Sequence, residues 1–214
     1  MIFQFIAILS IFGVIIFIGE LSSKFIFNAF ISRKLSHMAC GGIIASLPYF
    51  LDKCWSIALL SSLIIIVILT KVLKVFKNIE GPEKENWGTL YFPLGALFSL
   101  LLFWSINPLI FSGSILILGF ADSSAAIIGK KYGKRNYAAK KTLEGSLAFY
   151  VVSCLICLIV SMISNSFVLI QFDQLAIVIG GSLVLTIVEA INIKGLDNLS
   201  IPAIGGLILL LLIG

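Results

Sequence analysis

Long apolar runs separated by short polar breaks constrain this chain more than any other feature of its sequence. Of its 214 residues, 60% are hydrophobic and only 12% are charged, whereas an ordinary soluble domain carries about 25% charged residues. A chain with half the usual fraction of charged residues could not cover a surface that faces water. A helix needs roughly 20 apolar residues to cross a bilayer. The sequence therefore predicts an all-α, polytopic integral membrane bundle with a single domain over residues 1–214.

The polar breaks define the expected number of membrane spans. The apolar runs predict seven or eight transmembrane helices, at residues 2–21, 36–51, 54–73, 89–104, 107–128, 143–164, 173–192 and 199–213. The fourth and eighth runs are short, so a count of seven stays open. The first run has no basic segment before it and no small-residue cleavage site after it, so we expect a membrane span there rather than a signal peptide.

Lysines and arginines are distributed unevenly between the two sides that these spans create. Of the fifteen, three, four, six and one follow the first, third, fifth and seventh spans, which leaves only Lys53 for the other side. Cytoplasmic connections of membrane proteins carry an excess of these residues, so we expect the basic connections in the cytoplasm and both termini outside. This topology accounts for most of the net charge of +5, and nothing indicates nucleic-acid binding. A basic cytoplasmic face also suits anionic lipid headgroups or a nucleotide.

A basic cluster with the one histidine of the chain precedes the second predicted span. Arg33 and Lys34 lie four and three residues before His37, so a helix would place the three side chains on one face. Two interpretations stay open at this point. The cluster could serve only to orient the chain in the membrane, or it could have a chemical role.

The fifth predicted span carries an aspartate near its cytoplasmic end. Asp122 lies seven residues before Gly129, or roughly 10 Å along a helix that rises about 1.5 Å per residue. Because a carboxylate at membrane depth costs about 2.5–3.5 kcal/mol, it needs a partner or a role. It could pair with a lysine and fix helix packing, but the glycine-containing basic loop that follows favours metal binding or phosphoryl transfer. Small residues that permit close approach of a backbone or a ligand recur every four positions here: Ala121, Ala125, Gly129 and Gly133.

Further polar residues lie where other predicted spans meet the same side of the membrane. Thr142 is expected to cap the sixth span, with Glu144 in its first turn, where the helix dipole favours a carboxylate. Lysines, a helix N-terminus and acidic residues are together what a magnesium-bound polyphosphate needs, so Glu144 could serve either purpose. Glu189 and Asp197 flank the connection after the seventh span. The start of the fourth span adds three more polar or small residues: Asn86, Gly88 and Thr89.

In this order, these segments resemble the CTP-dependent polyprenol, dolichol, phytol and diacylglycerol kinase family, which is related to the membrane phosphatidate cytidylyltransferases. The resemblance covers residues 33 to about 202. Its five segments are Arg33-Lys34-x-x-His37; Gly88-Thr89-Leu90-Tyr91-Phe92-Pro93-Leu94; Asp122-x-x-Ala125-x-x-x-Gly129-x-x-x-Gly133-Lys134; Lys141-Thr142-x-Glu144-Gly145-Ser146; and Glu189 with Asp197-Asn198-x-x-x-Pro202. The chain departs from the family at Ala121, where glycine is usual, and the extra methyl group could crowd a nucleotide without abolishing its binding.

The resemblance implies an enzyme that transfers the γ-phosphate of CTP to a membrane isoprenoid alcohol or diacylglycerol at the cytoplasmic face. Asp122 and His37 are the expected catalytic residues, and either could accept the hydroxyl proton. The expected magnesium ligands are Asp122, Glu144, Glu189 and Asp197. The expected nucleotide-binding residues are Arg33, Lys34, Gly129, Lys130, Gly133, Lys134, Lys141, Thr142 and Gly145.

Two other functions are compatible with parts of the sequence. A membrane cytidylyltransferase, which makes a CDP-activated lipid, is expected to show His-Gly-Gly and then Asp-Arg-x-Asp near its end, but residues 189–198 contain no histidine. A small transporter would use intramembrane acids to carry protons or ions, yet transporters tend to have repeated halves and broken helices, and here the acids gather at one end without a visible repeat. A lipid kinase is therefore the favoured interpretation, with its lipid alcohol and oligomeric state left open.

Overall fold

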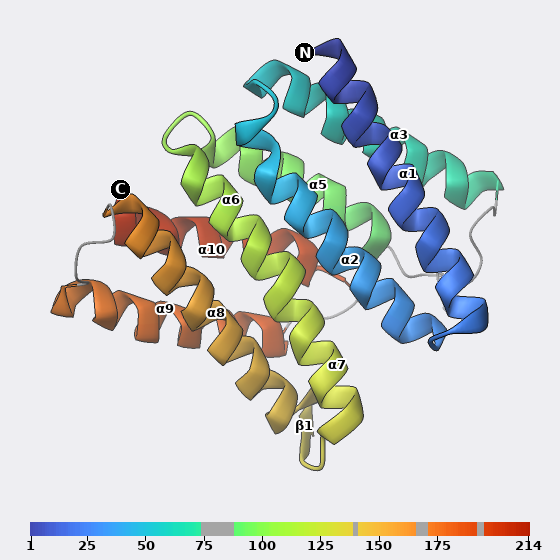
Figure 1. The fold of residues 1–214 in the computed structure, drawn as a ribbon. Helices are drawn as coiled ribbons and strands as arrows, with labels where there is room; N and C mark the ends of the chain where they lie inside the picture. The colour runs from blue at the N-terminus through green and yellow to red at the C-terminus, as the bar shows by residue number, and fades with distance from the viewer. Residues whose placement is uncertain (74–87, 139–140, 166–170, 192–194) are drawn as a thin grey trace.

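A computed structural model of the chain describes residues 1–73, 88–138, 141–165, 171–191 and 195–214 (Figure 1). Asn86 and several lysines used above to assign the sides of the membrane lie outside these ranges: Lys74, Lys77, Lys84, Lys140 and Lys194. The helices are α1 (Ile2–Phe25), α2 (Ala29–Ser46), α3 (Lys53–Leu73), α5 (Gly88–Phe103), α6 (Pro108–Leu116), α7 (Asp122–Tyr132), α8 (Leu143–Ser164), α9 (Phe172–Ile191) and α10 (Asp197–Ile213). Three short elements join them: the 3-10 helix η1 (Leu47–Tyr49), the π-helix η2 (Ile117–Ala121) and an antiparallel pair of strands, β1 (Asn136–Ala138) and β2 (Lys141–Thr142).

The predicted all-α bundle of membrane helices is confirmed. Among the described residues, five helical stretches are long and apolar enough to cross a membrane: Ile2–Phe25, Lys53–Leu73, Pro108–Tyr132, Leu143–Ser164 and Phe172–Ile191. α5 and α10 are shorter apolar helices, as the short fourth and eighth runs predicted. The bundle thus follows the order of the apolar runs in the sequence.

The start of α2 differs from the predicted second span. The helix begins at Ala29 rather than at residue 36, because the side chain of Asn28 accepts a hydrogen bond from the backbone N–H of Ile31 at 3.0 Å and caps it. A polar cap, and not hydrophobicity, therefore sets this boundary. As a result, Arg33, Lys34 and His37 all lie within the first turns of α2.

The continuous stretch α6–η2–α7 forms the centre of the bundle (Figure 1). Within its apolar window 72% of the residues are buried, against 17–33% for the other four candidate spans. Asp122 begins α7, directly after the π-helix, and its side chain is buried. The carboxylate is thus shielded from lipid by neighbouring helices.

Close backbone contact fixes α2 against this central stretch. A β-carbon on Gly41 would lie only 3.0 Å from the Cα of Gly119 in η2, so the helices approach at a distance that only glycine allows. π-helical segments often occur at functional sites. This crossing places the preceding turns of α2, with Lys34 and His37, beside Asp122.

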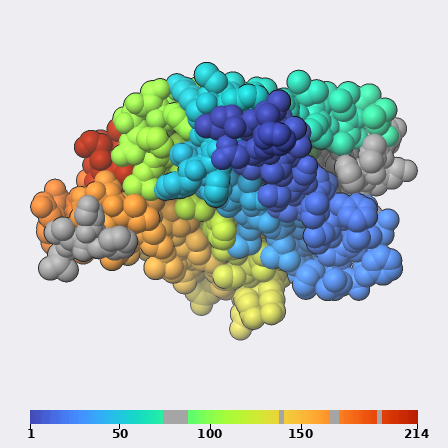
Figure 2. All heavy atoms as spheres, turned by 45° about the horizontal axis from the view of Figure 1, so that its top comes forward, coloured from blue at the N-terminus to red at the C-terminus, as the bar shows by residue number. Residues whose placement is uncertain are grey.

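Successive connections lie at opposite ends of the bundle. In Figure 1 the α1–α2 turn and the β1–β2 hairpin lie toward the lower edge, whereas the α2–α3 and α5–α6 connections lie toward the upper edge. Figure 2 shows the hairpin, in yellow, projecting from the lower edge of the molecular surface. The described connections therefore alternate in the way that the lysine distribution predicted.

Candidate active site

A polar cavity of about 590 Å³ lies where α2, α7, α8, α9 and α10 come together. Its charged lining comes from segments far apart in the sequence: Lys34, Asp122, Lys130, Lys141, Glu189 and Asp197. The predicted small or polar residues of α7 and α8 complete much of the wall: Gly129, Gly133, Thr142 and Gly145. The structure thus brings most of the predicted site residues into one space.

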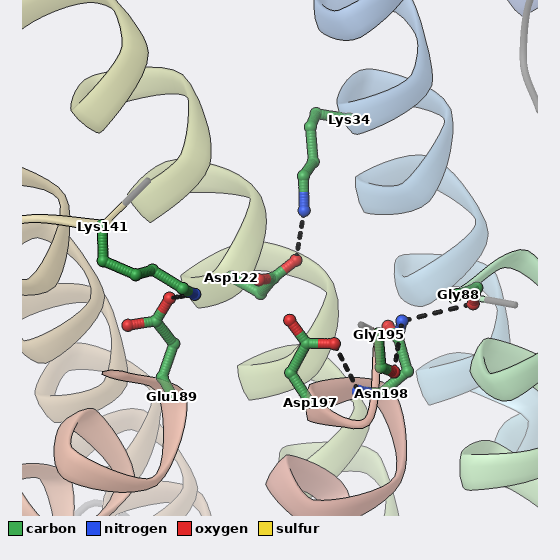
Figure 3. A network of polar contacts seen from close by, with 8 residues as sticks. All are labelled: Lys34, Gly88, Asp122, Lys141, Glu189, Gly195, Asp197 and Asn198. Atoms are coloured by element: carbon green, nitrogen blue, oxygen red, sulfur yellow. Dashed lines mark hydrogen bonds and ion pairs between the residues drawn. The ribbon is translucent and has the colours of Figure 1, made fainter. Parts of the chain in front are cut away.

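Two of the three carboxylates in this cavity form ion pairs with lysines (Figure 3). Nζ of Lys34 lies 2.5 Å from Oδ2 of Asp122 and donates a hydrogen bond to it, and Lys141 pairs in the same way with Glu189. The side chains of Asp122 and Glu189 are 7% and 3% exposed. Carboxylates buried to this degree require such partners, so the lysine pairing expected as one role of Asp122 is present.

Asn198 connects the beginning of α10 to the beginning of α5, and Asp197 lies beside it. The side-chain amide of Asn198 donates to the carbonyl oxygens of Gly88 and Gly195 at 3.2 and 3.3 Å. Gly195 has φ of +85°, and a β-carbon there would lie 2.8 Å from the Cα of Gly88. One oxygen of Asp197 accepts from the backbone N–H of Asn198 at 3.0 Å, and the other points toward Asp122 (Figure 3).

Lys141 lies in β2, outside the membrane-spanning helices, with its side chain 25% exposed. Burial is the largest single influence and lowers the pKa of this ammonium group. The charge and hydrogen bond of Glu189, with the charges of Asp122 and Asp197, together outweigh it, so the pKa is raised above its ordinary value. Lys141 therefore carries its positive charge throughout the neutral pH range. That charge is available to an anion that enters the polar cavity.

Small residues allow the end of α7 and the beginning of α8 to approach closely, next to the loop that joins them. The side-chain oxygen of Thr142 accepts a hydrogen bond from the backbone N–H of Gly145 at 3.1 Å, which confirms the predicted cap. A β-carbon on Gly145 would lie 2.9 Å from the carbonyl oxygen of Ala125, and one on Gly129 would lie 2.8 Å from Oγ1 of Thr142. The small residues of this stripe thus serve close packing of α7 against α8.

Comparison with known proteins finds several lipid kinases among the relatives of this chain. No model of a known protein family matches the sequence, and no solved structure is significantly similar to it. The chain is 24% identical to phytol kinase of Synechocystis sp. over 198 residues, which cover 89% of this chain and 83% of that protein. CTP-dependent diacylglycerol kinase 1 of Schizosaccharomyces pombe is 27% identical over 157 residues, 65% of this chain and 69% of that protein. Dolichol kinase of Saccharomyces cerevisiae is 42% identical over 89 residues, 40% of this chain and 15% of that protein.

The chain belongs to this family of lipid kinases. The resemblance inferred from the five sequence segments is thereby confirmed, and the protein is a phosphotransferase. The match to phytol kinase extends over most of both chains.

Several residues predicted for the site of this kinase lie elsewhere. Lys134 is exposed, and Oε2 of Glu144 lies 3.5 Å from the backbone nitrogen of Arg135; neither belongs to the polar cavity that the described residues form. Arg33 and His37 line a separate, mainly apolar cavity. Ala121 is fully buried in the core and is not among the residues that line the polar cavity.

Three carboxylates on one cavity wall supply the oxygen ligands that Mg²⁺ prefers. Within the described ranges, Oε2 of Glu189 is buried without a hydrogen-bond partner, so it is free to accept a cation. The same ranges contain no group of three acidic, histidine or cysteine side chains already spaced to hold a metal ion. The donor set of the kinase thus fits magnesium in kind, with Asp122 and Glu189 at present neutralised by lysines.

Some features of this site had no clear sign in the sequence. Asn136 and Ser146 also line the polar cavity, and no pattern marked Asn136 in advance. The π-helix before Asp122 was likewise unforeseen. Gly41 and Gly119 could be interpreted as a close helix contact only once α2 and η2 were known to meet.

Proposed function

We propose that this kinase transfers the γ-phosphate of CTP to the hydroxyl group of a membrane isoprenoid alcohol or diacylglycerol. The observation that carries the proposal is the polar cavity. In it, lysines and carboxylates from four distant segments face one space, close to the partly buried His37. The donor is supported by relatives named CTP-dependent diacylglycerol kinase. The acceptor class is supported by relatives named for phytol, dolichol and diacylglycerol.

The polar cavity offers several groups that bind phosphates. Lys34, Lys130 and Lys141 supply positive charge, and the N-terminus of α8 directs backbone N–H groups toward anions. Gly129 and Gly133 line this cavity and carry no side chains, so a polyphosphate can lie close to α7. These residues are proposed to bind and orient the triphosphate of CTP.

Asp122, Glu189 and Asp197 are the proposed ligands of magnesium, which when bound neutralises charge on the transferring phosphoryl group. In the reaction, the hydroxyl oxygen of the lipid attacks the γ-phosphorus, the bond from that phosphorus to the β–γ bridging oxygen breaks, and CDP leaves. We assign the hydroxyl proton to Nε2 of His37. This atom has no hydrogen-bond partner within the described residues, whereas Asp122 is occupied by Lys34.

The direct test combines purified protein in lipid nanodiscs with three acceptors and two nucleotides. Phytol, dolichol or diacylglycerol should be converted to its monophosphate with CTP, and more slowly with ATP, as measured by chromatography of the extracted lipids. Reactions without protein provide the control. Absence of phosphorylated product from every acceptor with both nucleotides would contradict the proposal.

We further propose that the polar cavity opens at the cytoplasmic face, since the basic connections lie at its end of the bundle. In intact cells, a membrane-impermeant thiol reagent should leave a Lys131→Cys residue unlabelled in a Cys54→Ser background, because Lys131 lies at the loop end of α7. The matched control is the wild-type protein, which retains Cys54. This exposed cysteine lies beside Lys53 at the opposite end of the bundle, so it should be labelled. Labelling at position 131 from outside would reverse the proposed orientation.

A further inference from the structure

A second cavity, of about 150 Å³, lies between α1, α2, α3 and α5. It runs along a face of α2 adjacent to the one that carries Lys34. We infer that this cavity binds the lipid alcohol, with the part of the tail next to the hydroxyl between the four helices and the hydroxyl itself at His37 and Thr89. The inference rests on the proposed kinase function and specifies where its acceptor binds.

The lining of this cavity changes from polar to apolar along its length. Its polar residues lie near the helix ends that face the loops: Arg33, Ser36, His37, Thr70 and Thr89. Deeper in the bundle the lining is apolar, with Phe12, Ile44 and Leu63 as examples. From Arg33 to Ile44 the cavity follows α2 for roughly 16 Å at about 1.5 Å per residue, or about half of a hydrocarbon core. A molecule with one hydroxyl and a long hydrocarbon tail matches this gradient.

Two buried polar atoms of the cavity lack partners. Within the described part of the chain, Nε2 of His37 and Oγ1 of Thr89 are buried without a hydrogen-bond partner, although such atoms nearly always have one. They belong to different helices, α2 and α5, and both residues line the same cavity. One alcohol group would satisfy both, because it can donate to Nε2 and accept from the threonine hydroxyl.

The position of His37 links this cavity to the polar one. Its ring packs on Phe92 of α5, with ring centroids 4.1 Å apart, which restricts its orientation. On α2 it lies three residues after Lys34, whose ammonium group pairs with Asp122 in the polar cavity. A hydroxyl bound at His37 would therefore present its oxygen toward the phosphates while its tail stays among apolar side chains.

Photocrosslinking tests this site without any catalytic turnover. Phytol carrying a diazirine in the first half of its chain, added to the wild-type protein without nucleotide, is expected to label cavity residues of α3 such as Leu63 and Val67. An excess of unmodified phytol should abolish this labelling. Adducts confined to outward-facing positions such as Ile65 and Ile68, which are exposed, and insensitive to competition would overturn the inference.

Two neighbouring substitutions in α3 provide a kinetic test. Val67 lines the cavity, whereas Ile68 is 45% exposed on the outside of the helix. Val67→Phe should raise the KM for phytol by about tenfold or more, because a filled apolar pocket excludes its substrate, and it should leave the KM for CTP unchanged. Ile68→Phe should change neither.

The outcomes separate the acceptor site from the proposed function. Equal KM values for phytol in wild type, Val67→Phe and Ile68→Phe would overturn the site while the kinase activity stands. A wild-type protein that phosphorylates no alcohol would overturn the proposed function. The crosslinking pattern would then show by itself whether the cavity binds a lipid alcohol. The same pattern answers this question if Val67→Phe fails to fold.

Discussion

An Asp122→Asn variant is expected to fold and reach the membrane normally, yet to lose phosphoryl transfer by several orders of magnitude. The amide oxygen can still accept the hydrogen bond from Lys34, so the contact between α2 and α7 persists. What disappears is the negative charge that would hold magnesium and through it neutralise the transferring phosphate. The measurement is CTP-dependent phosphorylation of phytol by purified wild type and variant across a magnesium titration.

A double variant separates this chemical role from a structural one. Asp122→Asn leaves the partly buried Lys34 without its counterion, which can itself be harmful. Lys34→Gln combined with Asp122→Asn restores a neutral pair of similar shape. If Asp122 serves only packing, the double variant should regain activity at saturating CTP, whereas a role in catalysis keeps it inactive. An active Asp122→Asn protein with ordinary magnesium dependence would require a site rebuilt around Glu189 and Asp197.

The second large effect is expected at Lys141. Replacement with Ala removes a charge-assisted phosphate contact worth about 1.5–3 kcal/mol, which at about 1.4 kcal/mol per decade weakens CTP roughly ten- to a hundredfold. Lys134→Ala is the matched control, because this lysine belongs to the same basic segment but is exposed and outside the polar cavity. We expect little change in the KM for CTP in that variant. Equal KM values for Lys141→Ala and wild type would reduce Lys141 to a determinant of membrane orientation.

Loss of Lys141 also leaves Glu189 buried without its partner, so stability must be measured beside affinity. An uncompensated buried charge can cost about 3–5 kcal/mol. The double variant Lys141→Ala with Glu189→Gln removes that charge. It should recover the thermal stability of wild type, which attributes any destabilisation of Lys141→Ala to the unpaired carboxylate. Because Glu189 is also a proposed magnesium ligand, the single variant Glu189→Gln is measured beside it, and the loss of CTP affinity is assigned to the lysine from Lys141→Ala.

The helices of this protein could be predicted from its apolar runs because membrane helices are defined mainly by length and hydrophobicity. Helix boundaries that depend on a single polar contact were harder to predict, as the cap at Asn28 shows. Membership of the kinase family followed from five spaced segments, whose separation in sequence gave no distances. Their convergence on one cavity depends on helix crossings, above all on the contact between Gly41 and Gly119.

Proximity to a motif in the sequence did not determine which side chains enter the cavity. Lys134 and Glu144 lie within the recognised segments, yet neither residue lines the polar cavity. Arg33 and Lys34 are neighbours on α2, but adjacent positions on a helix point about 100° apart, so they reach different cavities. The apolar cavity was beyond sequence analysis altogether, because four helices contribute to it and its apolar residues resemble any others that face lipid.

The central claim is tested most directly by asking which phosphate of CTP is transferred to the lipid. Purified protein is incubated with phytol, or with a phosphorylated lipid, and CTP labelled either at the γ- or at the α-phosphate. The account predicts that γ-label alone enters the lipid, only with the alcohol, and that CDP is released. Transfer of α-label to a phosphorylated lipid, with release of pyrophosphate, would show cytidylyl transfer and contradict the assignment as a lipid-alcohol kinase.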